Sequence, residues 1–476
     1  MTVRMCGTKF IYLLVPIVNI VSISVGTSIS WPSSQLPKLE DADESPLGRA
    51  ITDNEASWIT SLYTIGGIVG PLMFGYLNDL IGPKKTLIVL SVPFIGPYLV
   101  FAFANNIILY YVGRFVLGIG ISSVYSICTL YVANIAENKN RGLLSSATMF
   151  FVALGSLFSY CIGPYTSSMV FNLILAVIPS VYLVLLIILA PESPRYLIKR
   201  GDIEGATKSL EIIHGYTDDR IKKEIEDIQN SAMEKKIEGG RITDLFSTKA
   251  ARFAFFMGIF LTTTQQLSGF GVVLTYTSQI FDATKSKLTS SQSSIIVGVM
   301  QVLCAPIAPL FSDKFGRRIM MLFSLTGGIF SEILLATYFT LNDQGKNLDS
   351  VSWLPLFSMS LLMAAKYSGL ANLPWAIIAE IYPSKLKSIG SSIINAFSNL
   401  VGFAALYFFN GLVDSIGLGG MFYLYSCLMA VATVILYTTL PETKGKSFEE
   451  IQDIISGHKK NSNNTGMENP AFSEKE

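Results

Sequence analysis

Long apolar runs recur along the whole of this 476-residue chain, and no other feature restricts its fold as strongly. An α-helix needs roughly 20 apolar residues to cross a bilayer. Half of the residues are hydrophobic and only 14% are charged, whereas about a quarter of an average soluble protein is charged. We therefore expect an all-α membrane protein with twelve transmembrane helices, at residues 10–30, 57–77, 84–104, 108–133, 143–163, 168–190, 253–281, 292–311, 317–340, 352–380, 389–411 and 418–440.

Basic residues predict which side of the membrane each connection occupies. They gather in every second short connection between the expected spans, and loops rich in Lys and Arg stay in the cytosol. The first apolar run is long and has no small-residue cleavage site, so we expect it to be retained. Both termini and the segment 191–252 are then cytosolic. The basic residues in question are Lys84, Lys85, Lys139, Arg141, Lys314, Arg317, Arg318, Lys385 and Lys387.

Several functional classes are disfavoured by what the sequence lacks. The five cysteines are scattered, and the two histidines, His214 and His458, lie in polar segments. This pattern offers neither a disulfide framework nor a metal site. We find no nucleophile–base–acid set and no phosphate-binding glycine loop, so an enzyme is not expected. The sequence predicts no cofactor, no metal and no nucleic-acid partner.

Weak internal repetition divides the chain into halves. The segment Gly75-Tyr-Leu-Asn-Asp79 after the second expected span is echoed by Leu310-Phe-Ser-Asp313 after the eighth, and Pro191-Glu-Ser193 is echoed by Pro441-Glu-Thr443. A duplicated transporter places its binding site between such halves. We expect an N-terminal six-helix half at 1–190, a cytosolic helical linker at 191–252, a C-terminal six-helix half at 253–440, and a mostly disordered tail at 441–476.

Short motifs occur in a fixed order over essentially the whole chain. They are Gly113-Arg-Phe-Val-Leu-Gly118, Arg141-Gly142, Pro191-Glu-Ser-Pro-Arg195, Gln265-Gln-Leu-Ser-Gly269, Asp313-Lys-Phe-Gly-Arg-Arg318, Pro374-Trp-Ala-Ile-Ile-Ala-Glu380 and Pro441-Glu-Thr-Lys-Gly445. Together they resemble the signature set of the sugar porter family of the major facilitator superfamily. Pro46-Leu-Gly-Arg49 and Asn54-Glu-Ala-Ser-Trp58 further resemble the insect trehalose-transporter-like branch.

Two adjacent amides, Gln265 and Gln266, interrupt an apolar span. Desolvated amides without partners are destabilising, so both need hydrogen bonds inside the protein. A sugar offers hydroxyls that donate and accept, and Trp375 can cover its C–H face. The alternative is that the two amides join helices to one another. The resemblance favours the sugar.

The resemblance also implies further substrate-binding residues. Pro374 should break the tenth span locally, because it removes a backbone donor and clashes with the preceding turn. Asn399, or Ser398 if the register shifts by one, matches an asparagine of the eleventh span. The other implied contacts are Gln301, Thr275, Tyr276, Tyr367 and Lys366.

Charged residues near the cytosolic ends of the spans resemble the family's gating salt bridges, which hold the cytosolic side closed. An alternative for some of them is a topological role as positive-inside markers. The implied network comprises Arg114, Arg141, Glu192, Arg195, Asp313, Arg317, Arg318, Glu380, Lys387 and Glu442.

The chain departs from the family pattern at several positions. Met149 replaces a sugar-binding glutamine of the family, and Gly271 replaces an asparagine, so the resemblance implies two fewer sugar hydrogen bonds. Asn134 stands where a glutamate is usual, and Leu80 and Pro83 stand where arginines are expected. The resemblance therefore does not identify the sugar.

Lys366 is the least expected residue, because an unpaired ammonium inside a membrane is costly. Counting residues from Arg318 to Glu332 and from Lys366 to Glu380 puts both charges at about 21 Å depth, at 1.5 Å per residue. A buried Glu332–Lys366 ion pair is one hypothesis. The other is that Lys366 faces the sugar cavity, as the resemblance implies.

The first span, which usually carries an aspartate in proton-coupled relatives, contains no acid at residues 10–30. We therefore expect facilitative transport of a hexose or trehalose by a monomer in the plasma membrane, with the lipid bilayer as its surroundings. Proton symport through Glu332 is an alternative. A transporter-like sugar sensor with little flux is another.

Overall fold

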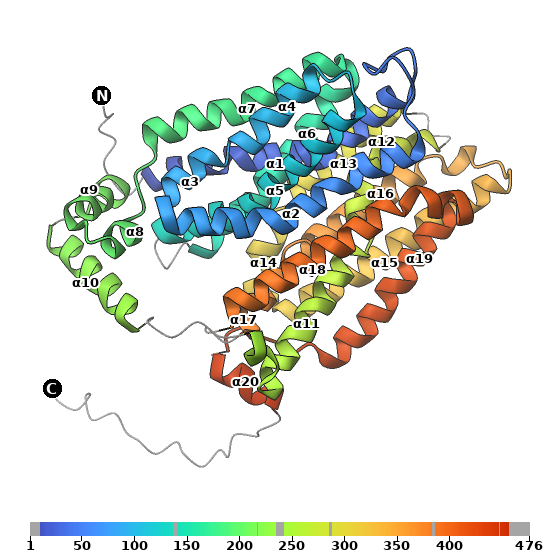
Figure 1. Ribbon diagram of the computed structural model, residues 1–476. Coiled ribbons are helices and arrows are strands. Elements are labelled where there is room, and N and C mark those ends of the chain that lie inside the picture. Colours follow the sequence, from blue (N-terminus) through green and yellow to red (C-terminus); the bar gives the residue numbers. More distant parts are fainter. Residues whose placement is uncertain are drawn as a thin grey trace.

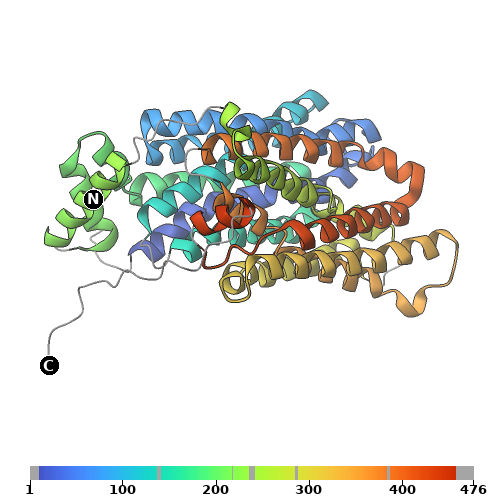
Figure 2. The same cartoon turned by 90° about the horizontal axis from the view of Figure 1, so that it is seen from below.

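The computed structural model describes residues 10–136, 141–216, 218–234, 242–284, 288–382, 386–446 and 448–456. The described part of the chain is helical apart from short connections and contains no strand, which confirms the predicted all-α class. Figure 1 shows the N-terminal helices, blue to green, beside the C-terminal helices, yellow to red. Seen from below, the helices run along a common direction and a small helical group projects from one end (Figure 2).

The N-terminal half contains seven α-helices. Its third expected span is divided into α3 and α4, which follow Gly82 and Ser91. A Thr52–Glu55 capping box begins α2, and the Asn106 side chain caps α5. The bounds are α1 Phe10–Glu40, α2 Asp53–Ile81, α3 Pro83–Val89, α4 Val92–Ala102, α5 Ile107–Ile135, α6 Arg141–Ile162 and α7 Ser168–Leu189.

The C-terminal half follows a group of short helices. That group, α8 Pro194–Lys199, α9 Ile203–His214 and α10 Asp218–Glu234, packs around its own apolar cluster at one end of the bundle (Figure 1). The helices of the half and the short helix after it are α11 Lys249–Gln266, α12 Phe270–Asp282, α13 Ser290–Cys304, α14 Ile307–Phe315, α15 Arg317–Asp343, α16 Leu354–Ser368, α17 Leu373–Ile381, α18 Lys387–Tyr407, α19 Phe409–Thr439 and α20 Phe448–Ser456.

Among the described residues, 10 helical segments are long and apolar enough to cross a membrane. The remaining two expected spans, 253–281 and 352–380, are each divided by a break, into α11 and α12 and into α16 and α17. Each of these shorter helices falls below the length of a continuous span. The fold thus has twelve spans. We call these two the discontinuous spans, because the other divided pairs, α3–α4 and α13–α14, each still form one helical segment long enough to cross.

We call the end that contains residues 41–52 the loop end and the end that contains α8 to α10 the linker end. Odd and even spans alternate in direction, so α1 runs toward the loop end and α2 returns from it. The loop end carries the connection from α12 to α13, whereas α17 finishes at the linker end. These two names fix the positions of the residues described below.

Close helix packing in the N-terminal half depends on glycine. A Cβ atom on Gly118 of α5 would lie 1.8 Å from the Tyr63 carbonyl oxygen of α2, and one on Gly66 would lie 2.0 Å from the Phe115 carbonyl oxygen. Small residues at such crossings let membrane helices approach closely. The backbone of α5 therefore packs directly on that of α2.

Gly118→Ala is expected to lower the stability of the folded protein by about 1–3 kcal/mol, because the new methyl group meets backbone atoms that cannot rotate away. The thermal midpoint of the purified protein measures this change. Gly96→Ala on α4 is the matched control, since a Cβ there has no neighbour within 4 Å. Equal midpoints for the two variants would contradict the packing argument.

Candidate functional site

Two helix breaks bring the predicted sugar-binding amides to the middle of the C-terminal half. Helix α11 ends at Gln266, and Gly269, with a left-handed φ of 69°, begins α12. Helix α16 ends at Ser368, and α17 starts with Leu373 and Pro374 in its first turn. The predicted break near Pro374 is present, because proline is tolerated at a helix start but not in its interior.

The Gln265 side chain links the two breaks. Its Nε2 donates hydrogen bonds to the carbonyl oxygens of Leu370 and Ala371, at 2.9 and 3.0 Å. Both acceptors lie between α16 and α17, in the segment where the helix is interrupted. Among described residues, the carboxamide oxygen of Gln265 accepts no hydrogen bond. That oxygen is able to accept from a substrate hydroxyl.

Gln266 points toward α18. Its Nε2 donates to Ser398 Oγ at 3.2 Å. The next residue, Asn399, donates from Nδ2 to the Asn395 carbonyl oxygen at 2.9 Å. A Cβ on Gly67 of α2 would lie 2.5 Å from Asn399 Oδ1, so this part of α18 lies against the N-terminal half. Gln266 thus meets Ser398 and Gly402 of α18, whereas Asn399, the next residue along α18, lies against α2.

Gln301 and Thr275 are buried without partners. The Gln301 side chain on α13 is 0% exposed and lies beside the Tyr160 hydroxyl, but among described residues neither of its amide atoms has a hydrogen bond of good geometry. Thr275 on α12 is also 0% exposed, and its hydroxyl likewise lacks a partner in the described part of the chain. Leaving a buried polar group unsatisfied costs about 1–3 kcal/mol, so both groups need an outside partner.

Aromatic residues flank the breaks. Tyr367 on α16 is buried and meets Phe270 edge to face, with ring centroids 5.6 Å apart. Trp375 on α17 is half-buried and packs against the apolar cluster of the C-terminal half. Both rings belong to the discontinuous span made of α16 and α17, one on each side of its break. They can offer apolar faces to a sugar ring.

Tyr276 lies in a seal between the halves. Its backbone is non-helical within α12, its hydroxyl lies 2.9 Å from Thr60 Oγ1 of α2, and its ring packs on Phe409 at 4.7 Å. The sequence predicted Tyr276 as a sugar contact. In this conformation the Tyr276 hydroxyl is instead hydrogen-bonded to Thr60 of the N-terminal half.

Hydrogen bonds between described residues of the two halves lie from the middle of the bundle to the loop end. Ser33 and Ser278 hydroxyls are 2.9 Å apart, and Gln279 Nε2 donates to Glu40 Oε1 at 3.0 Å. Asn410 Nδ2 donates to Ser57 Oγ at 3.2 Å. Tyr160 of α6, which the sequence did not single out, donates to the Leu274 carbonyl oxygen at 3.0 Å. The loop end is therefore closed.

The charged residues at the linker end pair within their own halves. Arg317 Nη2 lies 3.1 Å from Glu380 Oε1. Glu442 accepts hydrogen bonds from the backbone N–H groups of Arg317 and Arg318, at 3.0 and 3.1 Å. Glu192 accepts one from the Lys84 N–H at 2.9 Å. Each of these pairs joins two residues of the same half.

The structure places the rest of the predicted network as follows. The carboxylates of Glu192 and Glu442 each cap the start of the helix after a glycine, Gly82 or Gly316, and the repeat seen in the sequence thus corresponds to the same contact in both halves. Arg195 and Lys387 are exposed. The side chains of Arg141 and Asp313 lie outside the described part of the structure.

The prediction that Arg114 belongs to this network is wrong. Arg114 lies near the loop-end start of α5 and is 0% exposed. Its Nε donates to the Ile59 carbonyl oxygen and its Nη1 to the Ser28 carbonyl oxygen, both at 2.7 Å. Its guanidinium also lies over the Tyr63 ring, 4.9 Å from the centroid. The sequence places Arg114 near the cytosolic end of its span. In the structure, backbone carbonyl oxygens and aromatic rings hold its guanidinium in the interior of the N-terminal half.

Lys366 points away from the substrate region and toward α15. Its Nζ lies 3.6 Å from Glu332 Oε1, and both side chains are 0% exposed. The ammonium also donates to the Ser268 carbonyl oxygen at 2.8 Å and contacts Met429 Sδ. This placement agrees with the hypothesis of a Glu332–Lys366 pair and disagrees with the hypothesis that Lys366 lines the sugar cavity. A membrane-buried ammonium is retained most easily beside a carboxylate.

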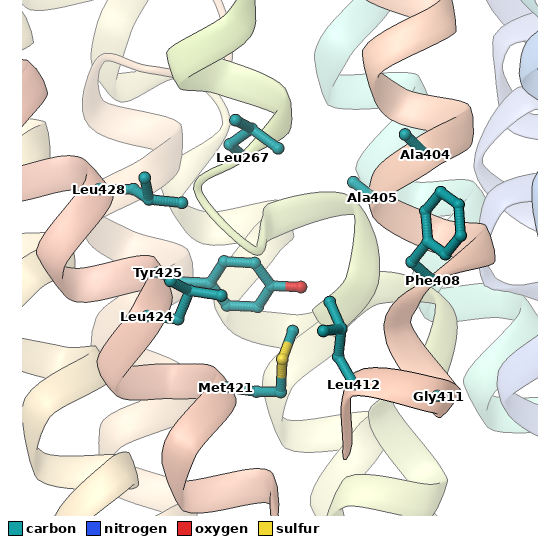
Figure 3. Close-up of a pocket in the computed structure, with 10 residues that line it drawn as sticks. All are labelled: Leu267, Ala404, Ala405, Phe408, Gly411, Leu412, Met421, Leu424, Tyr425 and Leu428. Atoms are coloured by element: carbon teal, nitrogen blue, oxygen red, sulfur yellow. The ribbon is translucent and has the colours of Figure 1, made fainter. Parts of the chain in front are cut away.

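A cavity of about 450 Å³ lies elsewhere, between α18, α19 and the break after α11. Figure 3 shows the Tyr425 hydroxyl pointing into it, with Phe408, Leu412 and Leu267 around it. Phe408 and Leu412 are exposed on the outer surface of the bundle. The lining carries no amide or charged side chain, so this cavity does not suit a sugar.

Comparisons with known proteins agree with this arrangement. A family model described as "Sugar (and other) transporter" matches residues 23–455. The facilitated trehalose transporter Tret1 of Apis mellifera ligustica is 28% identical over 442 residues, which cover 92% of this chain and 87% of that protein. The facilitated glucose transporter member 8 of solute carrier family 2 from Bos taurus is 27% identical over 457 residues, covering 91% and 92%.

A solved structure resembles the fold of the chain over nearly its whole length. The inward-open conformation of the xylose transporter XylE from E. coli superposes with a TM-score of 0.78 at 22% sequence identity. The match covers 93% of this chain and 99% of that one. The two proteins thus share the same arrangement of helices.

Proposed function

The chain belongs to the family of sugar (and other) transporters, and we propose that it carries a neutral sugar, a hexose or trehalose, passively across the plasma membrane. Its fold is that of the major facilitator superfamily. It is a multi-pass membrane transporter and not an enzyme. The proposal concerns its cargo, its energy source and its membrane.

The observation that carries the proposal is a set of neutral polar groups, two at the break after α11 and two on α12 and α13. The carboxamide oxygens of Gln265 and Gln266 are unoccupied by described residues, and Gln301 and Thr275 are buried and unsatisfied. A sugar supplies hydroxyls that donate to the oxygens and accept from the Gln301 amide. Since none of these groups is charged, the site favours a neutral polyol.

The closed loop end supports transport by alternating access. The hydrogen bonds between the halves around Tyr276 close the loop end. The linker-end charges of Arg317, Glu380 and Glu192 are paired within their own halves. In the opposite state we expect the linker-end residues to pair across the halves and the seal to open. Rigid motion of one half against the other around a central site is the usual mechanism of such folds.

The basic residues support the assignment of the linker end to the cytosol. With that orientation the loop end is extracellular, both termini are cytosolic, and the described conformation is inward-open. The XylE structure that superposes with a TM-score of 0.78 is likewise in an inward-open conformation. We also propose that a single chain is the transporting unit.

The surroundings of Arg114 support facilitated diffusion. Carbonyl oxygens and rings hold its guanidinium, and α1 beside it carries no acid before Glu40. Coupling to protons needs a carboxyl group that gains and loses a proton in each cycle. Glu332 is the intramembrane acid that symport would use, but Lys366 neutralises it. We therefore favour uniport over symport.

Uptake of radiolabelled glucose, fructose and trehalose into oocytes that express the chain tests the proposal. Saturable uptake of one of them, unchanged by a protonophore, is expected. Uptake that the protonophore abolishes would support symport through Glu332. Absence of uptake for each sugar, despite protein at the cell surface, would contradict the proposal and favour a sensor.

A further inference from the structure

The two helix breaks are joined by reciprocal hydrogen bonds. Gln265 of α11 donates to the Leu370 and Ala371 carbonyl oxygens in the break between α16 and α17. In return, Lys366 of α16 donates from Nζ to the Ser268 carbonyl oxygen in the break between α11 and α12, at 2.8 Å. Each discontinuous span therefore holds the irregular backbone of the other.

The position of Lys366 suits this contact. It lies in the last turn of α16, and Ser268 follows the last residues of α11. Carbonyl oxygens at a helix C-terminus lack helical partners and carry partial negative charge, which a cation stabilises. The ammonium thus satisfies the carbonyl oxygen that follows the C-terminal end of α11. Without it, the Ser268 carbonyl would lose its only side-chain donor among described residues.

Glu332 fixes the ammonium from a third direction. It lies on α15, an unbroken helix from Arg317 to Asp343, and its Oε1 is 3.6 Å from Lys366 Nζ. Both side chains are 0% exposed, so water does not screen the pair. The continuous helix therefore acts as a fixed support for the contact between the two discontinuous ones.

We propose that Lys366 is a positioning residue for the sugar site. It does not touch the sugar; it holds the Ser268 backbone and with it Gln265 and Gln266, which immediately precede the break. Through the reciprocal bonds it also makes the two breaks move together when the site changes access. This inference rests on the proposed sugar transport and adds a residue outside the sugar contacts.

The double variant Lys366→Met, Glu332→Gln tests this role. It removes the donor to Ser268 without leaving an unpaired buried charge. We expect the KM for the transported sugar to rise about tenfold, as expected for a carbonyl left without its donor, while the maximal rate per surface transporter stays within about twofold. Lys346→Met, at an exposed loop lysine, is the matched control. A KM within twofold of the wild-type value would overturn the proposal.

Amide hydrogen exchange in the purified protein gives a readout that does not depend on transport. In the double variant, exchange of residues 268–273 is expected to rise at least about tenfold, because local opening becomes easier. Unchanged exchange there would overturn the proposal even in a chain that transports no sugar. Failure of the wild type to transport any sugar, with raised exchange in the variant, would contradict the proposed function and leave the bracing role supported.

Discussion

A chain that carries both Gln265→Ala and Gln266→Ala is expected to lose saturable sugar uptake while it reaches the membrane at the wild-type level. Each amide contributes hydrogen bonds of about 1–3 kcal/mol to a desolvated sugar. Since about 1.4 kcal/mol corresponds to tenfold in affinity, the pair should change uptake at low sugar concentration by about 100-fold or more. Initial rates, divided by surface protein, measure the effect.

The single variants separate the two roles of these amides. Gln266→Ala removes a sugar contact and the bond to Ser398, whereas Gln265→Ala also frees the carbonyl groups of the α16–α17 break. Gln344→Ala, at an exposed glutamine after α15, is the control for loss of an amide elsewhere. Retained uptake in the double variant would show that these glutamines serve helix packing.

Lys366→Met alone is expected to leave little folded protein. The variant removes one partner of a buried ion pair, and breaking such a pair from one side costs about 3–5 kcal/mol. Glu332 would then stay charged without a partner or take up a proton, and either outcome is unfavourable inside the membrane. The monodisperse fraction after solubilisation and the thermal midpoint of that fraction measure the loss.

The reciprocal change sharpens this prediction. Glu332→Gln should be similarly damaging, because it leaves Lys366 unpaired, and combining the two changes should restore folding. The non-additivity of the double-mutant cycle is the signature of the pair. Two single variants that fold normally and shift only the choice of sugar would instead mean that Lys366 faces the substrate.

Much of the fold could be predicted from the apolar runs. Twelve spans and a duplicated half follow from run length and repeated motifs, because a membrane helix must satisfy its own backbone. The breaks were only partly foreseen. Pro374 predicted one of them, whereas the break after Gln266 depends on Gly269 adopting a left-handed backbone, and glycines are too common in this chain to mark it.

The sequence predicts the site less well where a contact depends on how deep in the membrane a side chain lies. Gln265 and Gln266 are predicted from a motif, and Gln301 and Asn399 from the family resemblance; the first two lie at the helix break. Arg114 was placed at the wrong depth, because a motif gives sequence order and not distance from the membrane surface. The contacts of the Tyr160 hydroxyl and the Ser268 carbonyl oxygen are not predicted, because no sequence motif marks which hydroxyl or backbone carbonyl will form a hydrogen bond between distant helices.

The Lys366–Glu332 contact shows what residue counting can achieve. Equal distances from the charged ends of α15 and α17 placed the two side chains at the same depth, and the structure brings them to 3.6 Å. Counting could not reveal that the ammonium also reaches Ser268, because the break shifts the backbone of α11 away from helical geometry. The bracing role therefore becomes visible only in three dimensions.

Transport by purified protein in sealed liposomes tests passive sugar transport most directly. With no ion gradient, the internal concentration of the transported sugar is predicted to rise to the external concentration and stop there. An imposed proton gradient, acidic outside, is predicted to change neither the initial rate nor this final value. Accumulation above the external concentration under that gradient would contradict the account.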